Sequence, residues 1–302
     1  MDSIIAENIS KTYGTVKALK EVSLTVQKGE LFGLIGADGA GKTTLFRILA
    51  SLILPDAGKA SVEGLDPVSD YRRLRCITGY MPGRFSLYGD LTVEENIRFY
   101  ATVFGTTLEA GRVLIDDIYK QLEPFRNRAA SRLSGGMKQK LALCCALIHS
   151  PSVLFLDEPT TGVDPVSRRE FWLVLKHLRE SGMTVMVSTP YMEEAGQCGR
   201  IAFIKEGSIL YSETPGRIVE SFGETLYAVS SDRMHTLLDD VRSFTGIKYC
   251  YSFGDSHHFV VDESFSGEKA LAGYLAGIGY GNITVKKIQP TMEDCYMKLS
   301  LR

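Results

Sequence analysis

A glycine-rich segment near the start of the chain has the residue types and the spacing that bind phosphate groups. It reads Gly36-Ala37-Asp38-Gly39-Ala40-Gly41-Lys42-Thr43, which fits G-x-x-x-x-G-K-[ST], between an apolar stretch and an expected helix. Glycines let backbone amides approach the phosphates, and the helix N-terminus adds partial positive charge. An ordinary glycine-rich turn needs neither this spacing nor the lysine, so we predict a nucleotide-binding loop.

The side chains of this loop have distinct expected roles. Lys42 would reach the β and γ phosphates of a nucleoside triphosphate, and the Thr43 hydroxyl would be a ligand of the accompanying Mg²⁺. The predicted nucleotide-binding residues here are Gly36, Ala37, Asp38, Gly39, Ala40, Gly41, Lys42, Thr43 and Thr44.

Two acidic residues end a later apolar run, where Asp157 and Glu158 follow residues 153–156. Asp157 would hold Mg²⁺ through its water shell, and Glu158 would orient or deprotonate an attacking water. Alone, such a pair is equally compatible with a solvent-facing strand end. Together with the phosphate loop, it predicts a carboxylate site at a neighbouring strand end, with Glu158 as the catalytic residue.

A second helix start has the same physical character. Leu133-Ser134-Gly135-Gly136 precedes an apolar helix, so free amides and the helix dipole offer another anion site. A chain with one nucleotide loop does not need a second such site.

The apolar runs that must position these residues predict an α/β fold. Those at 31–36, 153–157 and 183–188 lack a polar face, as expected for central parallel strands covered by helices. The expected strands are 4–9, 21–26, 31–36, 59–63, 153–157, 183–188, 200–204 and 208–212, and the expected helices are 42–52, 93–104, 108–122, 135–149, 166–181, 191–198 and 215–222.

Near residue 224 the pattern changes to a β-α-β-β-α-β order. The expected elements are strand 226–230, helix 233–244, strands 247–253 and 257–262, helix 267–278, strand 282–288 and a closing helix 291–299. We predict two domains, residues 1–223 and a small α+β domain at 224–302. His257 and His258 are adjacent on a strand and should point to opposite faces, so we expect no shared metal there.

Composition excludes several classes of protein. Lys plus Arg is 34 and Asp plus Glu is 36, a net charge of −2, which argues against a global grip on nucleic acid. No export signal is expected at the acidic start, and the longest apolar run, residues 141–148, is too short to span a bilayer. The six cysteines show no C-x-x-C pair, so we expect buried free thiols in a reducing cytosol.

The segment Leu133-Ser134-Gly135-Gly136 matches the signature motif of the ATP-binding subunits of ABC transporters, and residues 3 to about 222 resemble these subunits. The resemblance implies a P-loop NTPase fold with a helical subdomain at about 84–150, and ATP and Mg²⁺ as ligands. In that family two subunits meet head to tail, and each signature motif closes on the γ phosphate held by the other subunit.

Further motifs follow from the same resemblance. Tyr13 matches the aromatic residue on which adenine stacks, although a lone tyrosine is more often a packing residue. Residues 159–164 match the loop that senses the partner site, and residues 91–96 match the subdomain facing the membrane partner. Residues 290–296 resemble the closing element of subunits that energise ABC-2 type exporters, and are also compatible with a simple capped helix.

Two positions depart from the family pattern. Gly83 stands where the family has a glutamine that contacts Mg²⁺ and water, and Pro190 stands where it has a histidine that contacts the γ phosphate. Neither residue can supply the lost side-chain hydrogen bond. Losing one such contact costs about 10²- to 10³-fold in turnover, so this chain's own site is expected to turn over slowly, whereas its signature motif is intact.

The resemblance implies an ATP-binding subunit that drives export through a separate integral membrane subunit, peripheral on the cytoplasmic face of the cell membrane. It would pair with a second ABC ATPase subunit, either as the degenerate half of an asymmetric pair or as a homodimer with two slow sites. The alternatives are a nucleotide-binding regulator without turnover and a non-transport ABC ATPase. The second usually carries two cassettes or a coiled-coil insertion, and neither is visible here.

Overall fold

The computed structural model describes residues 1–300, and the chain divides into two compact units. The first unit is Met1–Pro215 with the last described residues, and the second is Gly216–Lys298. None of the helices within residues 1–300 combines the length and the apolar character needed to cross a bilayer. The predicted boundary at residue 224 stays a prediction.

A six-stranded sheet forms the centre of the first unit, in the order β5-β6-β7-β3-β8-β9. Strands β3 (Leu31–Ile35), β6 (Val153–Asp157) and β7 (Thr184–Thr189) are buried along their whole length and run parallel. This confirms the central parallel strands expected from their apolar runs. The outer strands are β5 (Thr78–Met81), β8 (Arg200–Lys205) and β9 (Ser208–Glu213).

A second, antiparallel sheet has the order β2-β1-β4 and shares one apolar core with helix α1. Its strands are β1 (Asp2–Tyr13), β2 (Val16–Gln27) and β4 (Ala57–Val62). The first two are longer than the expected 4–9 and 21–26, because a hairpin with Gly14 at φ 57° pairs residues that look polar in the sequence.

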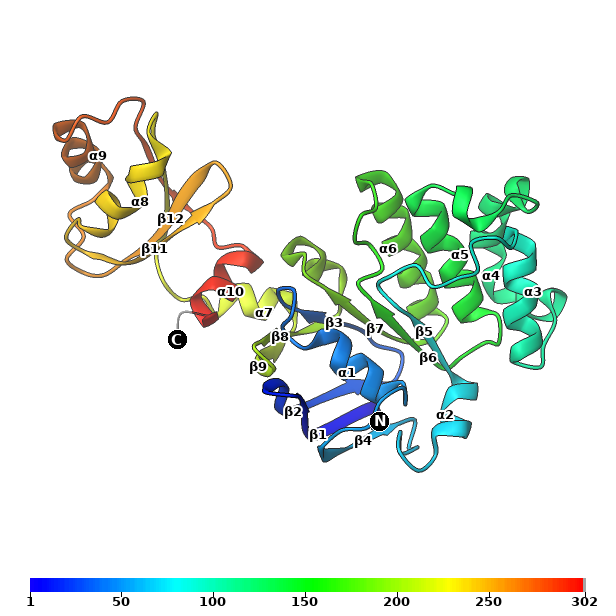
Figure 1. Ribbon diagram of the computed structural model, residues 1–302. Helices are drawn as coiled ribbons and strands as arrows, with labels where there is room; N and C mark the ends of the chain where they lie inside the picture. Colours follow the sequence, from blue (N-terminus) through cyan, green and yellow to red (C-terminus); the bar gives the residue numbers. More distant parts are fainter. Residues whose placement is uncertain (301–302) are drawn as a thin grey trace. The chain divides into compact units, whose positions relative to one another are not determined.

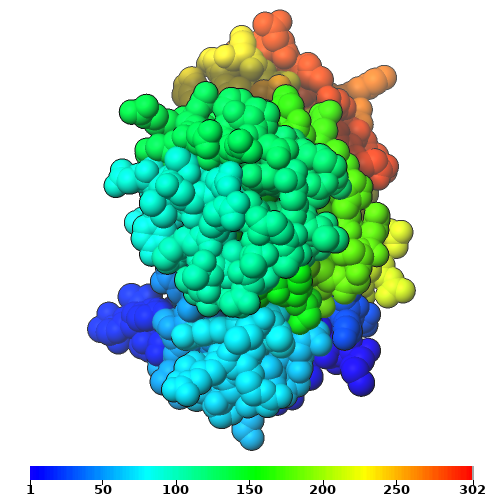
Figure 2. All heavy atoms as spheres, turned by 90° about the vertical axis from the view of Figure 1, so that its right-hand side faces the viewer, coloured from blue at the N-terminus to red at the C-terminus, as the bar shows by residue number. Residues whose placement is uncertain are grey.

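Six α-helices accompany these sheets in the described residues of the first unit. They are α1 (Lys42–Leu49), α2 (Tyr71–Ile77), α3 (Val93–Val103), α4 (Leu108–Leu122), α5 (Gly135–Leu147) and α6 (Pro165–Glu180), and α7 (Pro215–Glu220) follows at the start of the second unit. Helices α3, α4 and α5 pack on one another (Figure 1). Seen from their side, the teal to green part of the chain that contains them lies above the cyan to light-blue segment around α2 (Figure 2).

Three sequence expectations need correction. Helix α2 and strand β5 were not expected, because Tyr71–Ile77 carries three arginines and has only Leu74 buried. The expected helix 191–198 is a 3₁₀ helix, η3 (Met192–Gln197). All six cysteines are free, but Cys76 is exposed rather than buried; burial raises the pKa of the Cys144 and Cys145 thiols.

The second unit confirms the β-α-β-β-α-β order. Its elements are β10 (Leu226–Ser230), α8 (Met234–Arg242), β11 (Ile247–Phe253), β12 (Ser256–Val261), α9 (Glu268–Gly277) and β13 (Thr284–Ile288), followed by α10 (Met292–Ser300). The strands form one antiparallel sheet in the order β11-β12-β10-β13. Leu237, Val241, Leu271 and Leu275 of α8 and α9 pack on it in one core.

The two adjacent histidines on β12 face different neighbours. His257 Nε2 bonds with the Met234 carbonyl 2.9 Å away, whereas His258 Nδ1 lies 2.6 Å from Asp294 Oδ1. Thr291 caps α10 through reciprocal bonds with Asp294. Side-chain alternation along the strand therefore separates the two imidazoles, as expected.

Candidate functional site

The phosphate loop joins β3 to α1 at the carboxyl end of the parallel strands, where ligands of open α/β sheets bind. Its Gly41 has a φ of 106°, and a Cβ there would lie 2.5 Å from the Ala18 carbonyl oxygen, so only glycine fits. The Gly36 amide donates to the Thr189 carbonyl at 3.3 Å, and the Gly207 amide donates to the Ala40 carbonyl at 3.0 Å. Neighbouring strands thus fix both ends of the loop.

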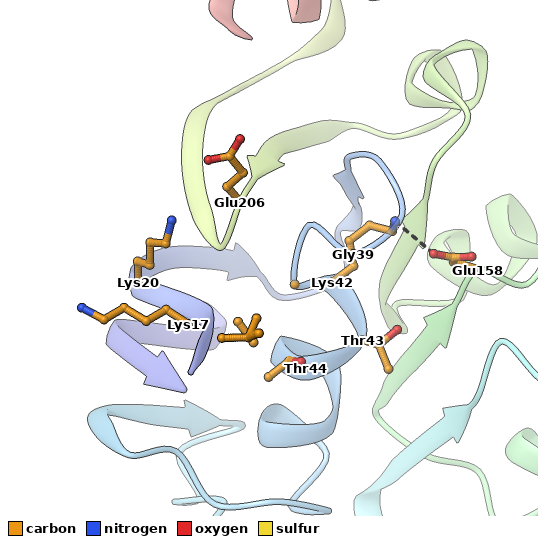
Figure 3. A pocket seen from close by; sticks show the side chains of 11 residues that line it. Lys17, Lys20, Gly39, Lys42, Thr43, Thr44, Glu158 and Glu206 are labelled. Carbon is orange, nitrogen blue, oxygen red and sulfur yellow. Dashed lines mark ion pairs between the residues drawn. The ribbon is translucent and has the colours of Figure 1, made fainter. Parts of the chain in front are cut away.

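Lys42 is 3% exposed, and its amino group is held inside this loop (Figure 3). It donates to the carbonyls of Gly36 at 2.8 Å and Ala37 at 3.0 Å, and it forms an ion pair with Glu158 Oε1 at 3.0 Å. A buried ammonium is costly without such partners. The loop therefore keeps a positive charge at the place where phosphates would bind.

Asp157 contacts both the phosphate loop and strand β7. Its Oδ1 accepts from the Thr43 hydroxyl at 3.1 Å and from the Ser188 hydroxyl at 2.7 Å. Asp157 is 3% exposed. A carboxylate and a hydroxyl are hard oxygen donors of the kind that Mg²⁺ prefers, so the residues present fit a magnesium ion.

The sheet order corrects one detail of the sequence expectation. The carboxylates do not follow a strand adjacent to β3, because β7 lies between β3 and β6. Ser188, on this intervening strand, bonds to the Asp157 carboxylate and to the Glu158 amide. It was not predicted, although a hydroxyl close to the end of an apolar strand is a visible signal.

Glu158 has a left-handed backbone conformation, with φ 52°. Its amide donates to both the Ser188 carbonyl at 3.1 Å and the Ser188 hydroxyl at 3.0 Å, which holds this turn. Residues kept in sparsely populated conformations concentrate at functional sites. The side chain is turned toward Lys42, as Figure 3 shows.

A cavity of about 400 Å³ opens beside the loop. Gly39, Gly41, Lys42, Thr43, Thr44 and Glu158 line it together with Val16, Lys17, Ala18, Lys20 and Glu206, the last five of which were not predicted (Figure 3). These five residues come from β2 and from the turn after β8, far away in sequence.

Tyr13 pairs with Val16 across the β1–β2 hairpin, is 47% exposed, and has the Lys11 amino group 5.7 Å from its ring centre.

The signature residues lie apart from this cavity, at the start of α5. Ser134 is the N-cap, and its hydroxyl accepts from the Met137 amide at 3.4 Å. Ser134 and Gly135 are exposed, whereas Leu133 and Gly136 are buried. The structure therefore brings together the loop and both carboxylates, and leaves the second helix start open at the surface.

Both departures from the family pattern adjoin the carboxylates. A Cβ on Gly83 would lie 2.9 Å from the Asp157 carbonyl oxygen and 3.6 Å from Glu158 Cβ. Pro190 directly follows β7, two residues after Ser188. On β5, Tyr80 lies near Asp157, and burial together with this neighbouring carboxylate raises the pKa of the Tyr80 phenol.

Comparisons with known proteins agree with this geometry. A family model described as ABC transporter matches residues 19–161. The probable multidrug ABC transporter ATP-binding protein YbhF of Escherichia coli (strain K12) is 44% identical over 217 residues, which are 70% of this chain and 37% of that relative. The chain thus spans little more than a third of that relative's length. Nod factor export ATP-binding protein I of Burkholderia lata is 37% identical over 241 residues, covering 78% of this chain and 79% of that one.

Solved structures give the same result. One described as the ATP-binding subunit of an ABC transporter has a TM-score of 0.66 at 26% identity, and covers 73% of this chain and 93% of that one. A dimeric ATP-binding cassette in a post-hydrolysis state, bound to ADP and Pi, has a TM-score of 0.64 at 27% identity, and covers 70% of this chain and 98% of that one. The predicted P-loop α/β fold is confirmed, and the chain belongs to the ABC transporter family of ATP-binding proteins.

Proposed function

We propose that this chain is the ATP-binding subunit of an ABC-type exporter and hydrolyses ATP to drive a separate membrane subunit. The observation that carries this proposal is the convergence of Lys42, Thr43, Asp157 and Glu158 at one edge of the sheet. Relatives named for multidrug transport and Nod factor export support an export role. This assignment implies a location on the cytoplasmic face of the cell membrane.

Each residue has a task in this chemistry. Lys42 and the loop amides would bind the β and γ phosphates, and Tyr13 would stack on the adenine. Thr43 and Asp157 would hold Mg²⁺, which neutralises phosphate charge. Glu158 would orient the attacking water and accept its proton.

An apolar groove of about 410 Å³ offers a docking place for the membrane subunit. It lies between the β5 region and helices α3 and α5, and its wall includes Met81, Pro82, Val103 and Phe104. Because Pro82 precedes Gly83, a helix docked there would adjoin the loop beside the carboxylates.

The exposed Ser134 and Gly135 support pairing with a second ABC ATPase subunit. In such a pair, residues 133–136 would complete the partner's nucleotide site. Gly83 and Pro190 favour an asymmetric pair, in which this chain supplies its signature to a competent site whose glutamine and histidine come from another subunit. The homodimer with two slow sites is the alternative arrangement.

Single-turnover ATP hydrolysis by the purified chain tests this proposal. We expect nucleotide binding with hydrolysis at least about 10²-fold below that of a cassette with both side chains intact, and faster hydrolysis when Pro190→His restores the imidazole. Normal turnover by the chain alone would exclude the asymmetric arrangement, and absence of ATP binding would exclude the whole proposal.

A second candidate is a nucleotide-binding regulator without turnover, favoured by Gly83 and Pro190. A glutamine at position 83 could not enter the present backbone without displacing it, since its Cβ would lie 2.9 Å from a carbonyl oxygen. ATP binding with no hydrolysis, even beside candidate partner subunits, would select this regulator.

A further inference from the structure

A buried carboxylate outside the predicted site connects the chain segments on both sides of Glu158. Glu194 lies on η3 and is 3% exposed. Its Oε2 accepts from the Thr189 hydroxyl at 2.6 Å and from the Thr160 hydroxyl at 3.1 Å. Its Oε1 lies 3.6 Å from Arg168 Nε. One carboxylate thus joins the end of β7, the loop after β6 and helix α6.

Both hydroxyls belong to segments that set the position of Glu158. Thr189 follows Ser188, which bonds to the Glu158 amide, and Thr160 is two residues beyond Glu158. Thr160 and Thr189 are 1% and 0% exposed, so they have no access to bulk water as replacement partners. Leaving a buried hydroxyl without its acceptor is costly, which makes Glu194 a strong constraint on both segments.

We infer that Glu194 is a positioning residue, which keeps Glu158 and the loop at residues 159–164 in register with the end of β7. Pro190 offers no side-chain hydrogen bond, whereas Glu194 accepts from both Thr160 and Thr189 and so links the two segments. Glu194 lies outside the cavity wall, so it acts on the geometry of hydrolysis rather than on ATP affinity. The inference rests on the proposed ATPase function.

The neighbouring Glu193 provides a matched control. It lies on the same 3₁₀ helix and pairs with Arg168 Nη1 at 2.8 Å, but its side chain is 75% exposed. Substituting either glutamate removes one negative charge beside Arg168. Only the substitution of Glu194 removes the acceptor from Thr160 and Thr189.

The test compares Glu194→Ala, Glu194→Gln, Glu193→Ala and Glu193→Gln in the purified full chain without partner subunits, so that the measured turnover comes from the site that contains this chain's own Glu158. We expect Glu194→Ala to lower kcat by about tenfold or more, with ATP affinity unchanged within about threefold. Glu194→Gln keeps one carbonyl acceptor and should recover part of kcat. Both Glu193 variants should match the wild type.

Several outcomes would overturn the inference. One is equal kcat in the Glu194 and Glu193 variants; another is a parallel loss of kcat, ATP affinity and melting temperature, which indicates a merely structural role. Should Glu194→Ala not fold, the two glutamine variants decide by the same comparison of kcat.

A second measurement separates this inference from the proposed function. Hydrogen exchange of the amides at residues 160–163 should be faster in Glu194→Ala than in Glu193→Ala, while exchange in α1 stays unchanged. This result needs no hydrolysis, so a wild-type chain without turnover would contradict the proposed ATPase and leave the positioning contact measurable. Equal exchange in the two variants would contradict the positioning role itself.

Discussion

Two buried aspartates, one in each compact unit, have opposite surroundings. Asp294 is 0% exposed, and both of its oxygens are used: Oδ1 by His258 and Tyr251, and Oδ2 by the amide and hydroxyl of Thr291. The two bonds of Asp157 both fall on Oδ1, and its neighbours Thr43 and Glu158 line a cavity.

This difference separates a structural carboxylate from one arranged for a ligand. A buried charge whose hydrogen-bonding capacity is used within the protein stabilises the packing around it. A buried charge beside a cavity, with further oxygen and amine groups in that wall, is arranged for an incoming partner. We therefore expect that loss of a carboxylate lowers turnover in the first unit and stability in the second.

The largest expected effect concerns Glu158→Gln in the first unit. Glutamine keeps the shape but cannot accept the proton of water, so turnover should fall by about 10²- to 10⁴-fold, with ATP binding retained. Phosphate release and titration with a fluorescent nucleotide measure the two quantities. Loss of nucleotide binding in parallel with turnover would place Glu158 among the binding residues instead.

Asp294→Ala should act on stability rather than on ATP. Removing one member of a buried charged cluster leaves His258 and Tyr251 without their acceptor, at a cost of about 3 to 5 kcal/mol in the free energy of unfolding. Denaturant titration, together with hydrogen exchange of the β12 amides, measures this loss of stability. Asp255→Ala, at an exposed acid beside the same strand, should change stability by less than about 0.5 kcal/mol; equal effects would remove the contrast.

Acid should destabilise the second unit, because two of its carboxyl groups have lowered pKa values. Burial tends to raise the pKa of Glu224, but hydrogen bonds from Lys248, Lys298 and Tyr249 outweigh it and lower the pKa from 4.5 to about 2. Likewise, hydrogen bonds from His258 and Thr291 outweigh burial and lower the pKa of Asp294. Because these folded pKa values lie below the unfolded ones, the stabilisation is present above about pH 4.5 and is lost as the pH falls toward 2.

For Glu224, after a reduction that allows for solvent screening, the loss in the free energy of unfolding is about 1 to 2 kcal/mol. Unfolding midpoints between pH 7 and pH 3 should fall on acidification, and Glu224→Gln should flatten the slope. A midpoint independent of pH in this range would contradict the expectation.

A modest effect on nucleotide affinity is expected for Tyr13→Ala at the rim of the site. Loss of a stacking ring costs about 1 to 3 kcal/mol, so the Kd for ATP should rise by about tenfold, whereas Tyr13→Phe keeps the ring and the affinity. Nucleotide titration of both variants measures this. Unchanged affinity in Tyr13→Ala would make Tyr13 a surface residue of the hairpin.

Local spacing was sufficient for much of the prediction. The loop at residues 36–44, the carboxylates after β6 and the β-α-β-β-α-β order of the second unit all depend on contiguous residues whose periodicity and turn chemistry act at short range. The short α2 and β5 were missed because their pattern is weak, and η3 was taken for an α-helix.

The residues of the phosphate loop follow from local sequence alone, because the turn and the helix start are properties of neighbouring residues. The order of the strands, with β7 between β3 and β6, became known only from the fold, and so did the fact that Thr43 and Ser188 both donate to Asp157 Oδ1. The fold also decided that Lys20 and Glu206 share one cavity wall and that Glu194 meets Thr160. Strand order sets these contacts, and it results from the packing of the whole core rather than from any local pattern.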